Sequence, residues 1–436
     1  MRRRSSFALG FLALIAVGAV VLCSPWARAA GTWGDPVAAL FTAFSAVCVT
    51  GLTVVNVASE FSRAGQVALL VLVELGCLGL MTCGTFFLIA IGRRLSLSQE
   101  FSLMNAYGVE QVQGLKGLIC WVVGSMLVIE SAFTVALYPV FGDWYNAVFY
   151  SVMSFCNAGF GLHEGSLAQF RGWYPVLVMG FETILGGIGF LVIYNLCTFK
   201  FLRRRGGGRG RITLHTRVVL RFTFYLLVFA FVAFLVIEWN KSLAGLPLMD
   251  RLVTGFYQAV TPRTCGFTIV PTEDLQPLTR LVYELLMFIG GAPGSAAAGM
   301  KVTTFAVIVY TLTAMCRGEN ETVITCKLVP SAVVRESIVI FTALIAFTVV
   351  ITGALFATEA GSGARADAIF FEAVSAVTTT GLSVGDTTAR LSTAGKFVIM
   401  AAMFIGRLGA LTVVMMIGDR ESSRHVRFPS EELVVG

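Results

Sequence analysis

Long apolar stretches that recur along the chain restrict its possible folds more than any other feature. Most of them reach or approach the roughly 20 residues that a helix needs to cross the hydrocarbon core of a bilayer. They occupy residues 7–22, 64–91, 118–137, 172–198, 222–237, 278–315, 337–356 and 395–417. With 56% hydrophobic and only 13% charged residues, the chain has too little polar surface for a soluble protein of 436 residues. The sequence therefore predicts an all-α membrane protein with about eight spanning helices.

The positive charges indicate which side of the membrane faces the cytoplasm. Most of the 32 Lys and Arg lie at the N-terminus, in 92–116, 199–221 and 316–335, and in the tail after Gly418. In an eight-span topology these segments share one side, and cytoplasmic loops are enriched in Lys and Arg. We therefore expect a multi-pass protein of the bacterial plasma membrane with both termini in the cytoplasm. The basic run at 200–211 is interpreted as a topology anchor near anionic lipid and not as a nucleic-acid site.

A fourfold internal repeat organises the chain. Four glycines spaced 107 to 115 residues apart anchor it, namely Gly51, Gly159, Gly266 and Gly381. A phenylalanine stands ten positions before each of them, at Phe41, Phe149, Phe256 and Phe371. A second glycine follows each anchor after 24 to 27 residues, at Gly76, Gly186, Gly290 and Gly406. Each unit has an apolar span, a short amphipathic segment with an aspartate near its start, the glycine motif and a second span.

The repeat predicts four duplicated units of helix, pore helix, filter loop and helix around one central pore. The short segments cannot cross a bilayer, and irregular backbone at membrane depth must be buried in protein or line a water-filled cavity. We expect repeat 1 at 1–91, repeat 2 at 92–198, repeat 3 at 222–315 and repeat 4 at 337–417. A basic cytoplasmic linker is expected at 199–221, a second linker at 316–336 and a cytoplasmic tail at 418–436.

The residues around the four anchor glycines predict a selectivity filter. A pore helix that stops halfway across the membrane points the negative end of its dipole at the membrane centre, where a cation is stabilised. Glycine then permits the positive φ angles that turn carbonyl oxygens inward. Because no ring of carboxylates occupies these positions, the backbone should select a weakly hydrated monovalent cation, which points to K⁺. The expected K⁺-binding positions are Val49, Thr50, Gly51, Asn157, Ala158, Gly159, Thr264, Cys265, Gly266, Thr379, Thr380 and Gly381.

A run of small residues, "GGAPGSAAAG" at 290–299, interrupts the apolar stretch 278–315. Gly, Pro and Ser at this density break a helix and leave backbone groups unpaired. We predict an intramembrane gating loop at 290–300, below the filter and movable. A flexible kink between closely packed helices is the alternative. The candidate gate residues in this loop are Gly290, Gly291, Pro293, Gly294, Ser295 and Gly299.

Arg407 is a further candidate gate residue. In the repeat register it corresponds to three small residues, Cys77, Gly187 and Gly291. An arginine inside a span is costly and usually faces the bundle interior or a cavity. We expect an electrostatic barrier below the filter that contacts the 290–300 loop. The alternative is a structural ion pair with an inner-helix carboxylate, Glu74, Glu182 or Glu284.

These motifs resemble those of the Trk/Ktr/HKT superfamily of potassium transporters. The resemblance covers essentially the whole chain and rests on the four filter motifs together with "ELGCLGLMT" (74–82), "ILGGIGF" (184–190), "FIGGAPGSAAAGMKVTT" (288–304) and "FIGRLGALT" (404–412). By length, the chain is most similar to the Ktr membrane subunit (KtrB). Family members of the plant-type branch that select Na⁺ carry Ser in place of the first filter glycine. Gly51 is retained here, which favours K⁺.

The resemblance implies the pore-forming subunit of a potassium uptake system, with K⁺ as the transported ion and no organic cofactor in this chain. It also implies a homodimer and a cytoplasmic nucleotide-binding regulatory subunit (KtrA/TrkA-like) that docks near 200–221, 316–335 and the tail. A Na⁺ or mixed monovalent cation transporter of the same fold is the alternative, because Asn157 and Cys265 depart from a Thr-rich filter. An enzyme is disfavoured, since no catalytic dyad or metal cluster is expected at membrane depth.

Overall fold

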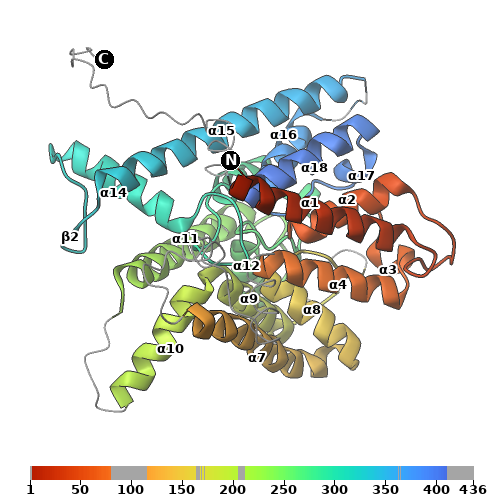
Figure 1. The fold of residues 1–436 in the computed structure, drawn as a ribbon, viewed down its shortest axis with the longest axis horizontal. Helices are drawn as coiled ribbons and strands as arrows, with labels where there is room; N and C mark the ends of the chain where they lie inside the picture. The colour runs from red at the N-terminus through yellow and green to blue at the C-terminus, as the bar shows by residue number, and fades with distance from the viewer. Residues whose placement is uncertain are drawn as a thin grey trace.

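The protein is built almost entirely from α-helices, as Figure 1 shows. The computed structural model describes residues 2–79, 115–163, 167, 169–170, 172–204, 212–361, 363 and 365–409. Within these residues the only sheet is a two-stranded hairpin of β1 (Val323–Ile324) and β2 (Lys327–Leu328). The all-α class predicted from the apolar stretches is confirmed.

The helices follow the same order four times. Unit 1 contains α1 (Arg2–Cys23), α2 (Pro36–Val47) and α4 (Arg63–Leu78). Unit 2 contains α7 (Leu115–Phe141), α8 (Trp144–Cys156), α9 (Trp173–Ile188) and α10 (Phe190–Arg204). Unit 3 contains α11 (Leu214–Glu238), α12 (Leu248–Val260), α13 (Pro277–Met287) and α14 (Val302–Cys316), and unit 4 contains α15 (Ser331–Thr358), α16 (Ala366–Val377) and α18 (Thr393–Leu408). The short elements α3 (Val57–Glu60), η1 (Thr272–Asp274) and α17 (Thr387–Arg390) follow the filter segments of units 1, 3 and 4.

Aspartates mark the beginnings of the four short helices α2, α8, α12 and α16. Asp35 caps α2 and Asp143 caps α8, each by accepting hydrogen bonds from N–H groups of the following turn. Asp250 and Asp367 lie in the first turn of α12 and α16 instead. A carboxylate there satisfies free N–H groups or complements the positive end of the helix dipole. The aspartates therefore fix where each short helix begins.

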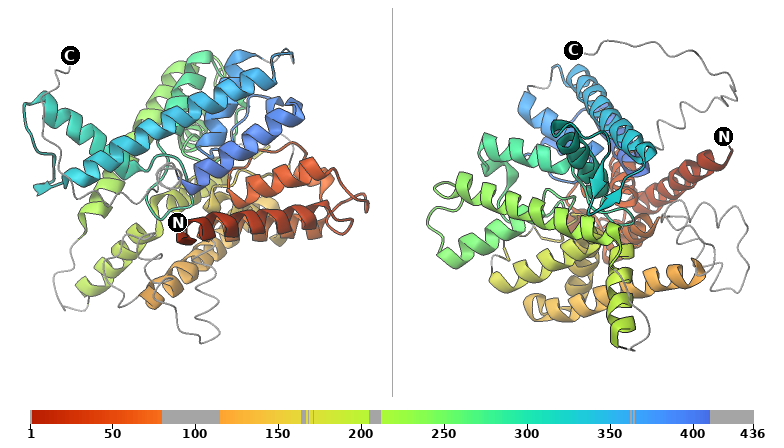
Figure 2. Two further views of the ribbon diagram at one scale, coloured as in Figure 1. Left: turned by 45° about the horizontal axis from the view of Figure 1, so that its top comes forward. Right: turned by 90° about the vertical axis from the view of Figure 1, so that its left-hand side faces the viewer.

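The four units close into a ring around one axis. Within each unit the short helix packs against its own outer helix, in the pairs α1–α2, α7–α8, α11–α12 and α15–α16. Between units, each inner helix packs against the short helix of the next unit, in the pairs α4–α8, α9–α12, α13–α16 and α18–α2. The last pair joins unit 4 back to unit 1. In the right-hand view of Figure 2, the colours of the four units follow one another around the centre.

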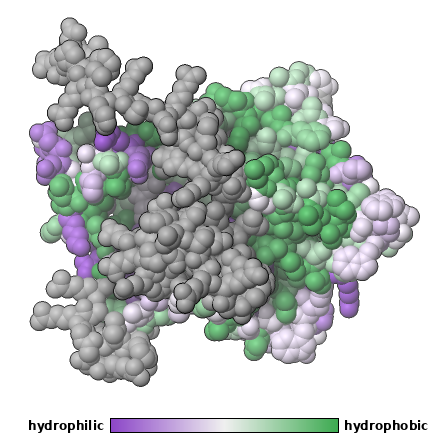
Figure 3. All heavy atoms as spheres, viewed as in Figure 1, coloured by the Kyte–Doolittle hydropathy of each residue, from purple (hydrophilic) through white to green (hydrophobic). Residues whose placement is uncertain are grey.

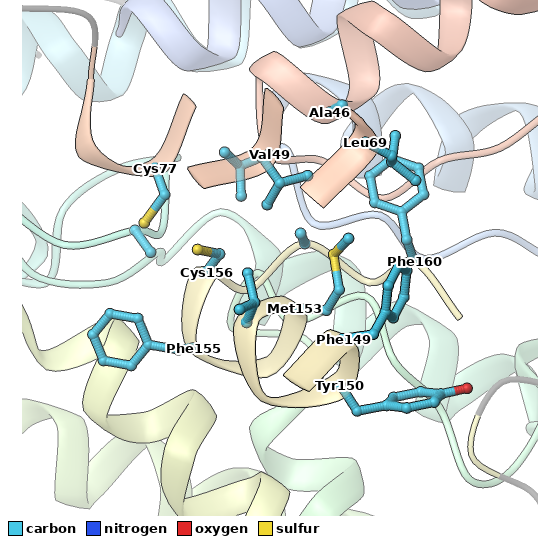
Figure 4. Close-up of a cluster of buried hydrophobic side chains, with 14 of the residues drawn as sticks. Ala46, Val49, Leu69, Cys77, Phe149, Tyr150, Met153, Phe155, Cys156 and Phe160 are labelled. Atoms are coloured by element: carbon cyan, nitrogen blue, oxygen red, sulfur yellow. The ribbon is translucent and has the colours of Figure 1, made fainter. Parts of the chain in front are cut away.

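Buried apolar side chains hold neighbouring units together around this axis. Figure 4 shows Met153 and Cys156 of α8 pointing toward Val49 and Cys77 of unit 1. All four side chains are at most 6% exposed. Burying such side chains contributes roughly 1.5–3 kcal/mol each for the larger ones. The contact between units 1 and 2 is therefore part of the core.

The outer helices carry the apolar surface expected of a membrane protein. Among the described residues, three helical segments are by themselves long and apolar enough to cross a membrane: Ile119–Phe141, Leu214–Glu238 and Ser331–Thr358. Large apolar side chains such as Val128, Phe229 and Val349 are more than half exposed on them. Figure 3 shows a broad apolar area on the face in view, with paler and purple residues at its right-hand edge. Lipid is the solvent that such a surface fits.

One apolar stretch that the pattern treats as a single span is broken in the structure. Residues 172–198 form α9 and the first part of α10, which meet at 95°. Gly189 at the bend has a φ of +92°, and an added Cβ would lie 2.9 Å from the carbonyl oxygen of Pro293. The 290–299 loop of unit 3 packs against this bend. Because the loop lies more than 100 residues further along the chain, no local sequence pattern indicates the bend. The stretch 278–315 is also divided, between α13 and α14, as its small residues predict.

Some predicted boundaries between repeats and linkers lie inside helices, and others lie outside the described residues. α10 ends at Arg204, α11 begins at Leu214 and α15 begins at Ser331, so helices extend into the ranges expected for the two linkers. The boundary at 91/92, the middle of the basic linker and the tail at 418–436 lie outside the described residues.

Candidate functional site

Each short helix is followed by the same unusual backbone conformation. The residue two positions before each anchor glycine has a positive φ, +55° at Val49, +57° at Asn157, +67° at Thr264 and +51° at Thr379. The anchor glycines are also left-handed, with φ of +93° at Gly51, +64° at Gly159, +77° at Gly266 and +84° at Gly381. The prediction of positive φ at these glycines is confirmed. When the backbone alternates between right- and left-handed conformations, successive N–H groups point to one side of the chain. The carbonyl oxygens then point to the opposite side.

The left-handed residues before the glycines are strained. Val49, Thr264 and Thr379 are β-branched, and a β-branched residue at positive φ is an outlier. Such a conformation costs about 1–3 kcal/mol and persists only where the surroundings hold it. Asn157 adopts it more easily, since asparagine is one of the few residues that visit this region routinely. Strain repeated in three of the four units indicates that the filter backbone is fixed for a reason other than stability.

Backbone hydrogen bonds hold these turns. Three units use the six-residue closure of a Schellman motif, with the N–H of Thr50, Ala158 and Thr380 donating to a carbonyl five residues earlier at 2.8, 3.0 and 2.8 Å. Unit 3 differs, because α12 ends six residues before its anchor glycine, earlier than the other short helices, and the N–H of Cys265 donates to the carbonyl of Thr261 at 3.1 Å. The same turn is therefore reached by two hydrogen-bond patterns.

The four anchor glycines lie against the backbones of the neighbouring units in a closed ring. An added Cβ on Gly51 would overlap the carbonyl oxygen of Ala158, and one on Gly381 would overlap that of Thr50. Likewise, a Cβ on Gly159 would lie 3.2 Å from the carbonyl oxygen of Cys265, and one on Gly266 would lie 3.0 Å from that of Thr380. Each contact is to the residue before the next anchor glycine. The structure thus brings the predicted filter segments of all four units together at one place.

A cavity of about 380 Å³ opens beside this ring. It is lined by Gly51, Gly159 and Gly381 and by residues that follow them, including His163, Ser383, Asp386 and Thr388. Nδ1 of His163 lies 2.7 Å from the hydroxyl of Tyr150. Burial lowers the pKa of His163 below its ordinary value. His163 therefore adds no positive charge to the cavity at neutral pH, and Asp386 is paired with Arg390 of α17 at 3.4 Å.

The second glycine of the repeat allows close approach between helices. An added Cβ on Gly76, Gly186 or Gly406 would overlap a carbonyl oxygen in the last turn of the short helix of the same unit, that of Val47, Phe155 or Val377. In unit 3, the Cβ of a substituted Gly290 would instead overlap the carbonyl oxygen of Ala298. In unit 3, the loop therefore takes the place that the end of the short helix has in the other three units.

That loop, between α13 and α14, contains the six predicted gate residues of the 290–299 run and folds against the bend between α9 and α10. The N–H of Ala292 donates to Gly187 at 2.9 Å, and the N–H of Phe190 donates to Gly294 at 3.0 Å. These bonds satisfy backbone groups that the 95° bend removes from the helical ladder. The irregular segments of units 2 and 3 therefore stabilise each other.

Three cationic side chains donate to carbonyl oxygens of this loop. Nη1 of Arg407 lies 2.7 Å from the oxygen of Ala296, and Nζ of Lys301 lies 2.6 Å from that of Ala297. Nη2 of Arg263 lies 3.3 Å from the carbonyl oxygen of Gly290. The predicted contact between Arg407 and the loop is confirmed.

Arg407 also reaches the first unit. Its Nη2 donates to the carbonyl oxygens of Gly76 and Cys77, at the end of α4. One guanidinium therefore joins units 4, 3 and 1. The alternative, an ion pair with an inner-helix glutamate, is not found among the ion pairs of the described residues.

Arg263 is a functional candidate with no predicted role. It lies in the third filter motif, three positions before Gly266, and is only 8% exposed. The corresponding residues of the other units are small: Cys48, Cys156 and Thr378. A single charge at a register position that is otherwise small is the signal that singles out Arg407, and it applies equally to Arg263.

Comparisons with known proteins agree with this architecture. The model of a family described as "TrkH: Cation transport protein" matches residues 28–425. The potassium/sodium uptake protein NtpJ of Enterococcus hirae is 33% identical over 442 residues, which covers 98% of this chain and 96% of that protein. The Ktr system potassium uptake protein B of Bacillus subtilis is 33% identical over 441 residues, with the same coverage. The potassium transporter TrkH from Vibrio parahaemolyticus, a crystal structure, matches with a TM-score of 0.76 at 18% identity, over 95% of this chain and 85% of that one.

Proposed function

This chain belongs to the TrkH family of cation transport proteins, and we propose that it is the pore-forming subunit of a potassium uptake system in the bacterial plasma membrane. Membership of the family places it among transporters of the Trk/Ktr type, as its motifs predict. The observation that carries the proposal is the closed ring of anchor glycines, in which backbone carbonyls of all four units meet. A substrate that binds there must be small and positively charged.

Potassium is the cation that such a carbonyl ring suits best. The twelve predicted filter residues, three from each unit, place no carboxylate in the ring, so backbone dipoles rather than fixed charges face the ion. Carbonyl oxygens can replace the hydration shell of a large, weakly hydrated ion. Negative helix ends of α2, α8, α12 and α16 add to the attraction. The strained backbone before each glycine keeps these dipoles in place before the ion arrives.

The loop between α13 and α14 is the proposed gate. It is held closed by backbone bonds to the α9–α10 bend and by Arg407, Lys301 and Arg263. Hydrogen bonds from charged donors contribute about 1.5–3 kcal/mol each. Opening must therefore break several such bonds together, which a cytoplasmic nucleotide-binding regulatory subunit can drive. The β1–β2 hairpin connects α14 to α15 within the proposed docking range 316–335, and the assembled transporter is proposed to be a homodimer.

A sodium or mixed monovalent cation transporter of the same fold is the second candidate. The residues before the anchor glycines are not uniform, because units 1 and 4 have Thr50 and Thr380 whereas units 2 and 3 have Ala158 and Cys265. A relative that is 33% identical is described as a potassium/sodium uptake protein. A filter with unequal units can hold ions of different size.

Uptake assays test the two candidates directly. We would express the chain, with its regulatory subunit, in a bacterium that lacks potassium uptake, and measure growth on low K⁺ and the uptake of ⁸⁶Rb⁺ and ²²Na⁺. Rescue of growth with Rb⁺ uptake, and Na⁺ uptake at least about tenfold slower, is the expected result. Equal rates for Rb⁺ and Na⁺ would favour the second candidate. An inserted protein that carries neither ion would overturn both.

A further inference from the structure

The side chain nine positions before each anchor glycine differs in charge among the four units. Units 1 to 3 have the neutral residues Thr42, Tyr150 and Tyr257, whereas unit 4 has Glu372. Glu372 lies on α16 and is 0% exposed. A fully buried carboxylate is rare unless it is paired. The surroundings of Glu372 therefore need an explanation.

Three donors surround the Glu372 carboxylate. Its Oε1 accepts from the hydroxyl of Ser383, its Oε2 accepts from the hydroxyl of Thr388 at 2.8 Å, and the backbone N–H of Val384 also donates to it. Donors favour the ionised form of a carboxylate, while burial opposes it. Burial raises the pKa of Glu372 to about 7, against the effect of these hydrogen bonds. The carboxylate is thus about half ionised at neutral pH and mostly ionised at alkaline pH.

In the part of the chain that the structure describes, no cationic side chain pairs with this charge. None of the ion pairs found among the described residues includes Glu372. Two of its partners, Ser383 and Thr388, line the cavity beside the filter ring together with Gly51 and Gly381. One layer of side chains therefore separates the carboxylate from the space that a cation crosses. An interaction across such a layer is weakly screened, because little water lies between the charges.

Anchoring of the filter segment does not by itself require a charge. In unit 2, the corresponding Tyr150 holds the residues after the filter through neutral bonds, accepting from the N–H of Leu162 at 3.0 Å and bonding His163 at 2.7 Å. Glu372 holds Ser383 and Thr388 in the same way, but with a formal negative charge. The charge is therefore surplus to the anchoring function.

We propose that the permeant monovalent cation in the cavity beside the filter is the counter-ion of Glu372, so that this single carboxylate sets the affinity with which the transporter takes up its ion. This inference rests on the proposed transport function. A buried negative charge behind one wall of the cavity attracts a cation without touching it and without replacing its carbonyl ligands. Glu372 then acts on the binding of the ion, while the glycine ring acts on selection.

The test compares the KM for Rb⁺ uptake in wild type and Glu372→Gln. Glutamine keeps the length and one acceptor oxygen but removes the charge. At about pH 8 we expect the KM of Glu372→Gln to be about tenfold higher, with a maximal rate within about twofold of wild type. A purely anchoring role would lower the maximal rate and the yield of folded protein and would leave the KM unchanged.

Glu238→Gln is the matched control. Glu238 is also 0% exposed and accepts two hydrogen bonds, from the N–H of Gln276 at 2.8 Å and from the hydroxyl of Thr279 at 2.5 Å. It does not line the cavity beside the filter. Its substitution should therefore leave the KM within about twofold of wild type. A similar KM increase in both variants would overturn the proposal.

A pH profile gives an independent measurement on the wild type. A carboxylate with a pKa of about 7 loses its charge as the pH falls, so the KM should rise about fivefold between external pH 8 and pH 6. Among the described residues, the titratable and charged groups near this region include His163, Asp386 with its partner Arg390, and Glu273, and they remain in Glu372→Gln. In that variant the KM should change less than about twofold over this range.

The outcomes separate this proposal from the transport function. If Glu372→Gln carries Rb⁺ with a KM within about twofold of wild type, the proposal is wrong while the transport function stands. If this variant does not reach the membrane, a wild-type KM that is constant from pH 8 to pH 6 overturns the proposal. Absence of Rb⁺ uptake by inserted wild type would overturn the transport function instead.

Discussion

The ring of anchor glycines and the layer of inner helices beside it have diverged to different extents. At the ring, all four units keep the same two left-handed residues, and each glycine contacts the backbone of the next unit. In the adjacent layer, unit 1 ends α4 near Gly79, unit 2 bends at Gly189, unit 3 inserts a loop and unit 4 carries Arg407. One layer has kept the symmetry of the duplication and the other has lost it.

The roles proposed for the two layers account for this difference. A site that surrounds an ion with carbonyl oxygens needs equivalent groups on all sides, so a change in one unit disturbs all four. A gate needs only one movable element, and the remaining units are free to hold it. The bend of unit 2 and the cations of units 3 and 4 all contact the same loop. Units 2, 3 and 4 have thus diverged in ways that all place contacts on the loop between α13 and α14.

The largest effect is expected from breaking the ring. Gly381→Ser places a Cβ onto the carbonyl oxygen of Thr50 at a φ of +84°. Because both the space and the backbone conformation exclude a side chain, we expect Rb⁺ uptake to fall about 100-fold, which corresponds to about 3 kcal/mol. Gly124→Ser is the control, since an added Cβ at Gly124 meets nothing within 4 Å. Equal uptake by the two variants would show that the ring is not on the ion path.

A smaller effect of opposite sign is expected from the asymmetric layer. Arg407→Gln removes charged donors to Ala296 and to the end of α4. Since these contacts hold the loop in place, Rb⁺ uptake without the regulatory subunit should rise about tenfold, which corresponds to the loss of about 1.4 kcal/mol. Arg251→Gln on α12 is the matched control and should leave uptake unchanged, because this arginine also donates to a backbone carbonyl, that of Leu246, but contacts neither the loop nor the ring. Unchanged or reduced basal uptake in Arg407→Gln would contradict a closing role for this residue.

The smallest effect concerns strain in the ring. Thr379 and Asn157 occupy the same register position at φ of +51° and +57°, both side chains are polar and buried, but only asparagine adopts this region easily. Thr379→Asn should therefore raise the free energy of unfolding by about 1 kcal/mol, and Asn157→Thr should lower it by a similar amount. Thermal unfolding of the purified protein measures both. Shifts of the same sign in the two variants would show that backbone strain does not decide stability at this position.

Features that repeat were predictable from the sequence, and features that depend on distant contacts were not. The four anchor glycines are visible as a register, and their positive φ follows from the absence of a Cβ. The positive φ at Val49 was not predictable, because valine disfavours it and only the assembled ring imposes it. The bend at Gly189 depends on a loop in another unit. Arg407 was found because a charge inside a span is costly, and Arg263 would have been found by the same argument.

The contact of α18 with α2 has a consequence for how the protein is made. The ribosome delivers the four units in order, and the first unit must wait for the last before its short helix is enclosed on both sides. Until α18 arrives, three units form an open arc with no complete ring of carbonyls. A chain truncated before α18 is therefore expected to be inserted in the membrane without a complete ring of carbonyls and to carry no ion.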